Sequence, residues 1–185
     1  MKKSLEKGFI TPLPVFIIAT YDENGVANAM NAAWAGQIAP NMVSISLGAL
    51  RSTENIKKTK ALTVSFATKE YVEACDYVGL VSQNKVPDKL EKCGFTVTKS
   101  EKVNAPIIDQ LPVAIECKVV DIQEEFGETR VVAEIVGLQA DESVLEGDKV
   151  DIGKLQPIMY DTVAKCYREI GTNIGGAWDA GKKFE

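Results

Sequence analysis

The sequence predicts a mainly β protein in which an antiparallel barrel carries peripheral helices. Two observations lead to this fold class: strand-like runs dominate the chain, and hairpin signals join neighbouring runs. The helical patterns between them are short, so their order does not match the alternation of a βαβ sheet. With 185 residues, 45% of them hydrophobic and 25% charged, the chain has the size and composition of one globular domain spanning residues 1–185.

The first predicted element is a buried strand over residues 14–21, a continuous apolar run rich in residues that favour β-structure. Asn24 and Gly25 follow as the dipeptide that most strongly indicates a hairpin turn. The chain then returns as a second strand over residues 26–30. Alternating apolar and polar residues over 42–47 predict a third strand.

A helix is predicted next, beginning at Ser52 or Thr53, because either hydroxyl can accept a backbone N–H as an N-cap. Residues 61–67 form the following predicted strand. Two further helices are expected over residues 70–80 and 87–94. The second of these has a proline near its start and a glycine at its end, where these residues favour a helix boundary.

The second half contains two long strand patterns, residues 113–125 and 129–139, which a short turn joins into an antiparallel hairpin. Apolar residues at every second position in the first pattern indicate a strand with one buried face. Residues 144–153 are acidic and interrupted by glycine, so we predict a surface loop there. From Pro157 onward the pattern is too irregular to assign elements.

Charge and apolar patterning exclude several classes of function. The net charge is −5 and the pI is about 5.0, which argues against a nucleic-acid binder, because such proteins usually carry a basic stripe. No apolar run approaches the ~20 residues of a membrane-spanning helix. The charged N-terminus lacks the apolar core of a signal peptide, so we expect a cytoplasmic protein without a membrane partner.

The side chains available for chemistry are restricted. The chain has no histidine, which excludes Ser-His-Asp and Cys-His catalysis and nearly all catalytic zinc sites, so no metal and no catalytic side chain are predicted. The four cysteines are not arranged as Cys-x-x-Cys, and we expect free thiols; they are Cys75, Cys93, Cys117 and Cys166. An enzyme with this composition would depend on a bound cofactor.

The segment from Leu47 to Ile56 has the features of a phosphate site. It runs from a strand through Gly48, where the backbone can be approached closely, into Arg51, Ser52 and Thr53 at a helix start. Unpaired N–H groups at a helix N-terminus bind phosphate, and a guanidinium can hold two phosphate oxygens. The alternative is a capped helix with a solvated arginine.

The segment from Asn28 to Gly36 is small and rich in amides. Its alanines allow backbone groups to meet a ring edge, and Asn28 and Asn31 each supply a donor and an acceptor. Trp34 can flank a ring face. The alternative is a turn with a core tryptophan. Together, a segment that can line a flat ring (residues 28–36) and a segment that can bind a phosphate (residues 47–56) predict a site for flavin mononucleotide (FMN).

Two further observations refine this prediction. Lys89 can add a cation near the phosphate, the alternative being a solvated lysine on a helix. Neither a G-x-G-x-x-G nor a P-loop motif is present, so a Rossmann nicotinamide domain and a P-loop nucleotide site are unsupported. A nicotinamide nucleotide, if used, would visit the flavin transiently.

The chain resembles the flavin reductase-like proteins with an FMN-binding split barrel, and among them the flavoredoxins. The resemblance covers roughly residues 8–167 and depends on four stretches taken in order: 14–34, 47–56, 64–66, and 79–82 with Asp88 and Lys89. It implies a homodimeric, six-stranded antiparallel split β-barrel that holds FMN non-covalently.

The resemblance also implies which residues contact the cofactor. The stretch from Asn28 to Trp34 would line the isoalloxazine and ribityl chain, Arg51 to Thr53 would bind the phosphate, Ser82 and Lys89 would reach the polar end, and Tyr160 would lie at the flavin. The predicted cofactor contacts are Asn28, Ala29, Met30, Asn31, Ala33, Trp34, Gly48, Arg51, Ser52, Thr53, Ser82, Lys89 and Tyr160.

This sequence departs from many relatives at Gln83, where they have glycine, and at Leu90, where they have phenylalanine. It also lacks the histidine that several relatives place near the flavin, which bears on nicotinamide turnover more than on FMN binding.

Three functions follow from these observations. The first is an oxidoreductase that passes reducing equivalents from NAD(P)H through FMN to an acceptor. The second is an FMN electron carrier that a protein donor reduces, with little nicotinamide turnover. The third is a β-barrel binding module without redox activity.

Overall fold

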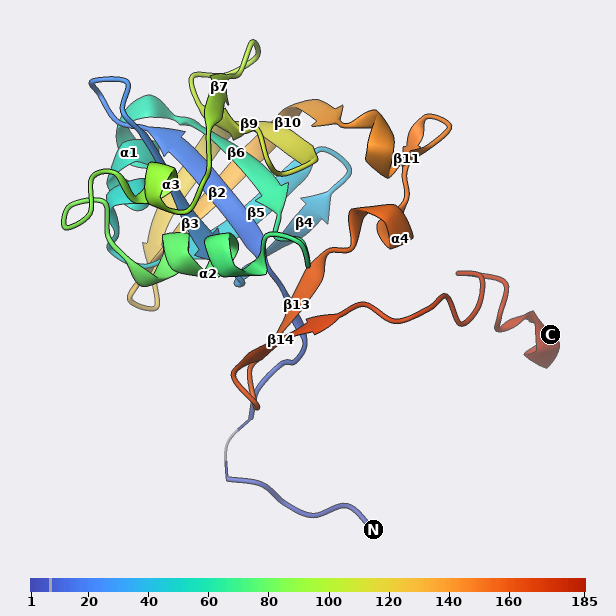
Figure 1. The fold of residues 1–185 in the computed structure, drawn as a ribbon. Coiled ribbons are helices and arrows are strands. Elements are labelled where there is room, and N and C mark those ends of the chain that lie inside the picture. The colour runs from blue at the N-terminus through green and yellow to red at the C-terminus, as the bar shows by residue number, and fades with distance from the viewer. Residues whose placement is uncertain (7) are drawn as a thin grey trace.

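The computed structural model describes residues 1–6 and 8–185, and most of its regular structure is β (Figure 1). The strands are β1 (Leu13–Pro14), β2 (Phe16–Tyr21), β3 (Ala27–Ala32), β4 (Ala35–Ala39), β5 (Met42–Leu47), β6 (Ala61–Phe66), β7 (Val97–Lys99), β8 (Pro106–Ile108), β9 (Val113–Glu125), β10 (Glu128–Ala140), β11 (Leu145–Glu146), β12 (Lys149–Val150), β13 (Ile158–Asp161) and β14 (Cys166–Glu169). The helices are α1 (Arg51–Thr59), α2 (Val72–Leu80), α3 (Lys89–Lys92) and α4 (Ile152–Leu155), with 3₁₀ turns η1 (Glu142–Val144) and η2 (Lys182–Phe184).

The main sheet is antiparallel and has seven strands in the order β3-β2-β6-β9-β10-β5-β4. The predicted mainly β class with antiparallel pairing is confirmed, but the expected count of six strands is corrected to seven. The physical reason is that the β-structure is interrupted at Ala33 and Trp34, so that β3 and β4 are separate strands. Consecutive strands therefore occupy the two opposite edges of the curved sheet.

The two predicted hairpins are confirmed. In the first, the backbone N–H of Asp22 donates to the carbonyl oxygen of Val26 at 3.0 Å, and Gly25 has the positive φ of 78° that such a turn requires. In the second, β9 and β10 pair along their length, and Gly127 turns the chain with a φ of 82°. Strands β5 and β6 also lie where the sequence predicted them.

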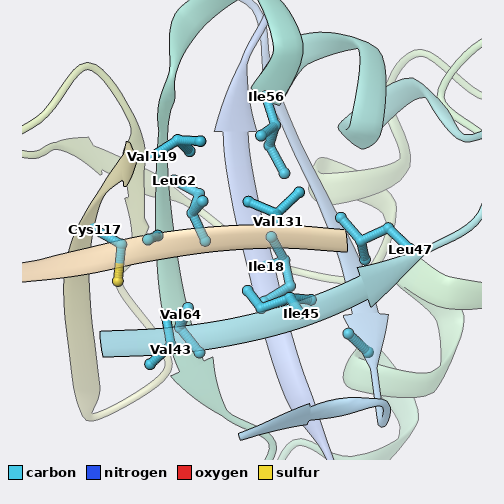
Figure 2. Packing of buried hydrophobic residues seen from close by; sticks show 12 residues of the cluster. Ile18, Val43, Ile45, Leu47, Ile56, Leu62, Val64, Cys117, Val119 and Val131 are labelled. Carbon is cyan, nitrogen blue, oxygen red and sulfur yellow. The ribbon is translucent and has the colours of Figure 1, made fainter. Parts of the chain in front are cut away.

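Strand β2 is buried on both faces, which explains why its sequence is continuously apolar. Ile18 points into the interior of the curved sheet, whereas Ile17 and Ala19 face a second cluster on the outside. Figure 2 shows the interior side chains from strands β2, β5, β6, β9 and β10 and from helix α1 converging on one another. The fully or largely buried members of this interior cluster are Ile18, Ala32, Val43, Ile45, Leu47, Ile56, Leu62, Val64, Cys117, Val119, Val131 and Ala133.

Helix α1 begins at Arg51, and Leu50 occupies the N-cap position without a side-chain cap, so the predicted capping by Ser52 or Thr53 is wrong. Both hydroxyls have other partners. Thr53 Oγ1 donates to the carbonyl oxygen of Gly48 at 2.7 Å, and Ser52 Oγ accepts from Asn28 Nδ2 at 2.9 Å. These bonds join the start of the helix to the preceding loop and to β3.

Helices α2 and α3 lie on the outer side of the sheet and cover the second apolar cluster, where Cys75 and Val78 of α2 pack with Phe95. The predicted helix over residues 87–94 is shorter than expected, with Gly94 ending it at a φ of 78°. The short strands β7 and β8, which follow, were not predicted.

The C-terminal part holds structure that the sequence did not indicate. The predicted surface loop contains the β11–β12 hairpin and the start of α4. Further along, β13 and β14 form a three-stranded sheet with β1 from the other end of the chain. Figure 1 shows the chain beyond β14 extending away from the body. In the part of the chain that the structure describes, no helix has both the length and the apolar character needed to cross a membrane.

Candidate cofactor pocket

A pocket of about 760 Å³ lies between the main sheet, α2 and the β13–β14 hairpin. This volume is within the range of cofactor and ligand pockets. Six of the predicted contacts line it, namely Met30, Asn31, Ala33, Trp34, Gly48 and Tyr160. The pocket also has lining residues that the sequence analysis missed, among them Asp76, Gly79, Glu128, Lys165, Cys166 and Tyr167.

The pocket brings the two predicted segments to one place. Strand β4 pairs with β5 so that Ala35 is opposite Ile45, and the backbone N–H of Ser46 donates to the carbonyl oxygen of Trp34 at 2.8 Å. This register places the Asn31–Trp34 turn beside Gly48, where β5 leads into α1. Sheet pairing therefore makes one site from segments about twenty residues apart.

The turn presents an amide and an aromatic ring. The Trp34 residue is 65% exposed, so the alternative of a core tryptophan is wrong. Asn31 is held against α2, where its Nδ2 donates to the carbonyl oxygen of Cys75 at 3.4 Å and its amide group lies directly against Gly79. Because glycine has no side chain, the Asn31 amide can lie against the helix at this point.

Arg51, Ser52 and Thr53 do not line the pocket, although Gly48 and Leu50 beside them do. Arg51 Nη2 is 2.7 Å from Asp22 Oδ2, so this arginine is ion-paired, and its buried Nε has no hydrogen-bond partner among residues 1–6 and 8–185. The N–H groups of the first helical turn have no partner within the helix. Backbone N–H donation from Val26, with a smaller contribution from Arg51, lowers the pKa of Asp22.

The remaining predicted contacts also lie away from the pocket surface. Ala29 is fully buried, and Asn28 is buried with its Oδ1 unpaired. Ser82 is exposed, and its Oγ accepts from the backbone N–H of Asn84 at 3.3 Å.

Lys89, the first residue of α3, is buried, and its side chain reaches the C-terminal end of α2, so the alternative of a solvated lysine is wrong. Its Nζ donates to the carbonyl oxygens of Val78 and Val81 at 2.9 and 3.1 Å. Burial lowers the pKa of Lys89 to about 8. The side chain satisfies backbone groups at the helix C-terminus, where a cation is favourable.

Gln83 follows Ser82 and is buried near β3. Its Nε2 donates to the carbonyl oxygen of Ala27 at 2.6 Å, while its Oε1 has no partner. Gln83 Oε1, Asn28 Oδ1 and Arg51 Nε are all buried polar atoms without hydrogen-bond partners among the described residues. Buried polar groups are usually satisfied, so these atoms indicate hydrogen-bonding capacity that the protein itself leaves unused.

One hydrogen bond between two residues that line the pocket was not predicted by any sequence pattern. Tyr167 Oη donates to Asp76 Oδ1 at 2.5 Å, joining β14 to α2 across 91 residues. Tyr160 lies beside Tyr167, with ring centroids 6.2 Å apart. No sequence pattern assigned strands beyond Pro157, so nothing could place Tyr167 opposite Asp76.

The side chains around the pocket can accommodate an organic ligand. Among the residues that the structure describes, no group of three or more histidine, cysteine, aspartate or glutamate side chains is positioned to hold a metal ion. The four cysteines are free thiols. Aromatic and amide groups beside a helix N-terminus can accommodate a flat heteroaromatic ring with an anionic tail.

Comparison with known proteins assigns the family. The profile described as "Flavin reductase like domain" matches residues 9–166, and the chain belongs to this family. Among solved structures, the flavoredoxin of Desulfovibrio vulgaris (Miyazaki F) is 34% identical with a TM-score of 0.91, over 98% of this chain and 100% of that one. The flavoredoxin from Methanosarcina acetivorans is 28% identical with a TM-score of 0.91, over 100% and 99%.

A curated but uncharacterized protein of Aeropyrum pernix is 24% identical over 125 residues, or 66% of this chain. The match covers 47% of that relative, so the chain spans about half of its length.

Proposed function

We propose that this protein is an FMN-binding oxidoreductase of the flavin reductase and flavoredoxin type, which passes reducing equivalents from NAD(P)H through non-covalently bound FMN to an acceptor. One observation carries the proposal: in a chain of this family, a single pocket is lined by both the amide–aromatic turn and the loop that leads into α1.

The residues present fit FMN. Asn31, Trp34 and Tyr160 would hold the ring, and the first turn of α1 with Arg51 would hold the phosphate. Arg51 Nε is a buried donor that no described residue satisfies, and an anionic ligand could accept a hydrogen bond from it. Bound FMN would supply hydride acceptance and electron transfer, while the protein binds the cofactor, orients it and limits access to it.

No side chain is assigned a catalytic role in this proposal. Trp34 and Tyr160 would cover parts of the ring and leave a face for a second ligand. Asn31 would orient the ring edge, because its amide is fixed between β3 and α2 by Cys75 and Gly79.

The second candidate is an FMN electron-transfer protein that a protein donor reduces, with little turnover of nicotinamide. The likeness to two flavoredoxins over nearly the whole chain favours this candidate. The absence of histidine, which several family members place near the flavin, points in the same direction.

One experiment tests both candidates. The purified protein is titrated with FMN, and the loaded protein is mixed anaerobically with NADH and then NADPH while flavin absorbance is recorded. Bleaching within seconds supports the reductase, whereas binding without bleaching supports the electron carrier. A protein that does not bind FMN contradicts both and leaves a binding module without redox activity.

We also propose a homodimer. Strand β4 is an edge strand of the main sheet, and Ile38 on β4 and Leu138 on β10 are 58% and 61% exposed. Unpaired edges and exposed apolar residues favour association with another chain. Light scattering after size-exclusion chromatography tests this, and a monomer at micromolar concentration would contradict it.

A further inference from the structure

The Asp76–Tyr167 contact links two walls of the pocket. Asp76 lies on α2 and Tyr167 on β14; both are half-buried and both line the pocket. The tyrosine hydroxyl donates to the carboxylate at 2.5 Å, which fixes the direction in which that carboxylate points. A donor to an ionised acceptor makes a strong hydrogen bond.

Asp76 lies next to the part of the pocket, around Asn31, that is proposed to contact the flavin ring. The carbonyl oxygen of Cys75, one residue before it, accepts from Asn31 Nδ2, and Gly79 contacts the same amide. Helix α2 therefore presents the Asn31 contact and the Asp76 carboxylate to the same pocket. Whatever Asn31 orients lies within the field of this carboxylate.

The Asp76 carboxylate forms no ion pair with a described residue. Within residues 1–6 and 8–185, no lysine or arginine nitrogen lies within 4.0 Å of it. Tyr167 remains a neutral donor, because burial first, and then the bond to Asp76 and its charge, raise the pKa of the tyrosine. The other ionisable groups that line the pocket are Tyr160, Cys166, Glu128 and Lys165. Glu128 and Lys165 are exposed, so solvent and salt screen their charges more strongly.

We infer that Asp76, oriented by Tyr167, lowers the reduction potential of FMN held in this pocket. The inference rests on the proposed function. Two-electron reduction adds negative charge to the pocket unless each electron is matched by a proton. A fixed carboxylate that is partly shielded from water opposes this added charge. The protein would thereby make its reduced cofactor a stronger electron donor.

Two substitutions separate charge from tethering. Asp76→Asn removes the charge but keeps an oxygen that can accept from Tyr167. Tyr167→Phe removes the hydroxyl but keeps the ring and the carboxylate. Glu73→Gln is the matched control, because Glu73 is an exposed carboxylate on the same helix that does not line the pocket.

The midpoint potential of bound FMN is measured anaerobically at neutral pH, by equilibration with a reference dye of known potential. For Asp76→Asn we expect the ratio of reduced to oxidised flavin at a fixed dye potential to rise at least about tenfold, which is about 30 mV for a two-electron couple. Tyr167→Phe should show a smaller rise, because the carboxylate keeps its charge but loses the hydrogen bond that fixes its direction, and Glu73→Gln should match the unmodified protein. If Asp76→Asn does not fold, the smaller Asp76→Ser must show the same rise.

An unchanged potential in Asp76→Asn overturns the inference while FMN binding, and with it the proposed function, still stands. Equal losses of FMN affinity in Asp76→Asn and Tyr167→Phe at constant potential would mean that the pair only tethers β14 to α2. An unmodified protein that does not bind FMN overturns the proposed function and this inference together.

Discussion

Replacement of Gly79 by alanine separates protein stability from cofactor binding. Gly79 lies in α2 and lines the pocket, and an added Cβ would overlap the amide group of Asn31. Because the overlapping atoms all belong to the end of the Asn31 side chain, this side chain must move away from α2. The substitution therefore acts on a proposed cofactor contact without altering that residue.

Gly79→Ala has two effects on the free energy of unfolding, a gain in helix propensity and the loss of one hydrogen bond, and they nearly cancel. Alanine is favoured over glycine in a helix by up to about 1 kcal/mol. The displaced Asn31 loses a long 3.4 Å hydrogen bond to Cys75, which contributes about 0.5–1 kcal/mol. Cofactor binding has no such compensation: loss of one or two amide bonds to FMN costs about 1–3 kcal/mol, or about 5- to 150-fold in Kd.

The assays are urea unfolding of the cofactor-free protein and a fluorescence titration with FMN. Gly36→Ala is the matched control, since a Cβ at Gly36 meets nothing within 4 Å. Asn31→Ala should reproduce the binding defect, and the double variant with Gly79→Ala should add little to it, because both act through one amide. A Gly79→Ala protein that binds FMN within about threefold of the unmodified protein would refute the assignment of Asn31 to the cofactor.

Three other predictions address the phosphate end, the interior and a buried cation. Arg51→Ala should weaken FMN binding by about 1.5–3 kcal/mol through lost charge-assisted bonds, and an unchanged titration would remove Arg51 from the site. Leu62→Ala should lower the free energy of unfolding in urea by about 2–5 kcal/mol, since Leu62 is fully buried in the interior cluster; a loss below about 1 kcal/mol would contradict this packing. Between the folded-state pKa of Lys89, about 8, and its ordinary value of 10.5, the unfolded chain binds more protons at this site. The contribution of Lys89 to stability should therefore rise with pH, by at most about 1.4 kcal/mol per unit, and Lys89→Met should lack this rise in pH-dependent urea unfolding.

Much of the β-structure could be predicted from local signals. The Asn24–Gly25 turn and the apolar runs on either side of it specify a hairpin without help from the rest of the chain. The continuous apolar character of β2 already indicated burial on both faces. Apolar residues at every second position in the first part of β9 indicated one buried face, but Ala114 and Glu116 on the opposite face are buried as well. These features depend on neighbours in sequence, so a single sequence contains them.

The site was predictable only in part. The small and amide residues of the Asn31–Trp34 turn and the glycine after β5 were chemically distinctive, and the structure places both in one pocket. The partners of the polar side chains were not predictable. Ser52 and Thr53 have the composition of helix caps, yet they bond to Asn28 and Gly48. A hydroxyl takes whichever acceptor or donor the fold brings nearest.

The sequence by itself determined the family, the strand-rich character and the type of ligand that its amide, aromatic and basic residues can accommodate. Only the tertiary structure decided that β4 is a separate edge strand and that β1 pairs with β13. It also decided that Asp76 meets Tyr167 at the pocket. Pairings between distant segments depend on how the whole chain closes on itself, and no local pattern encodes them.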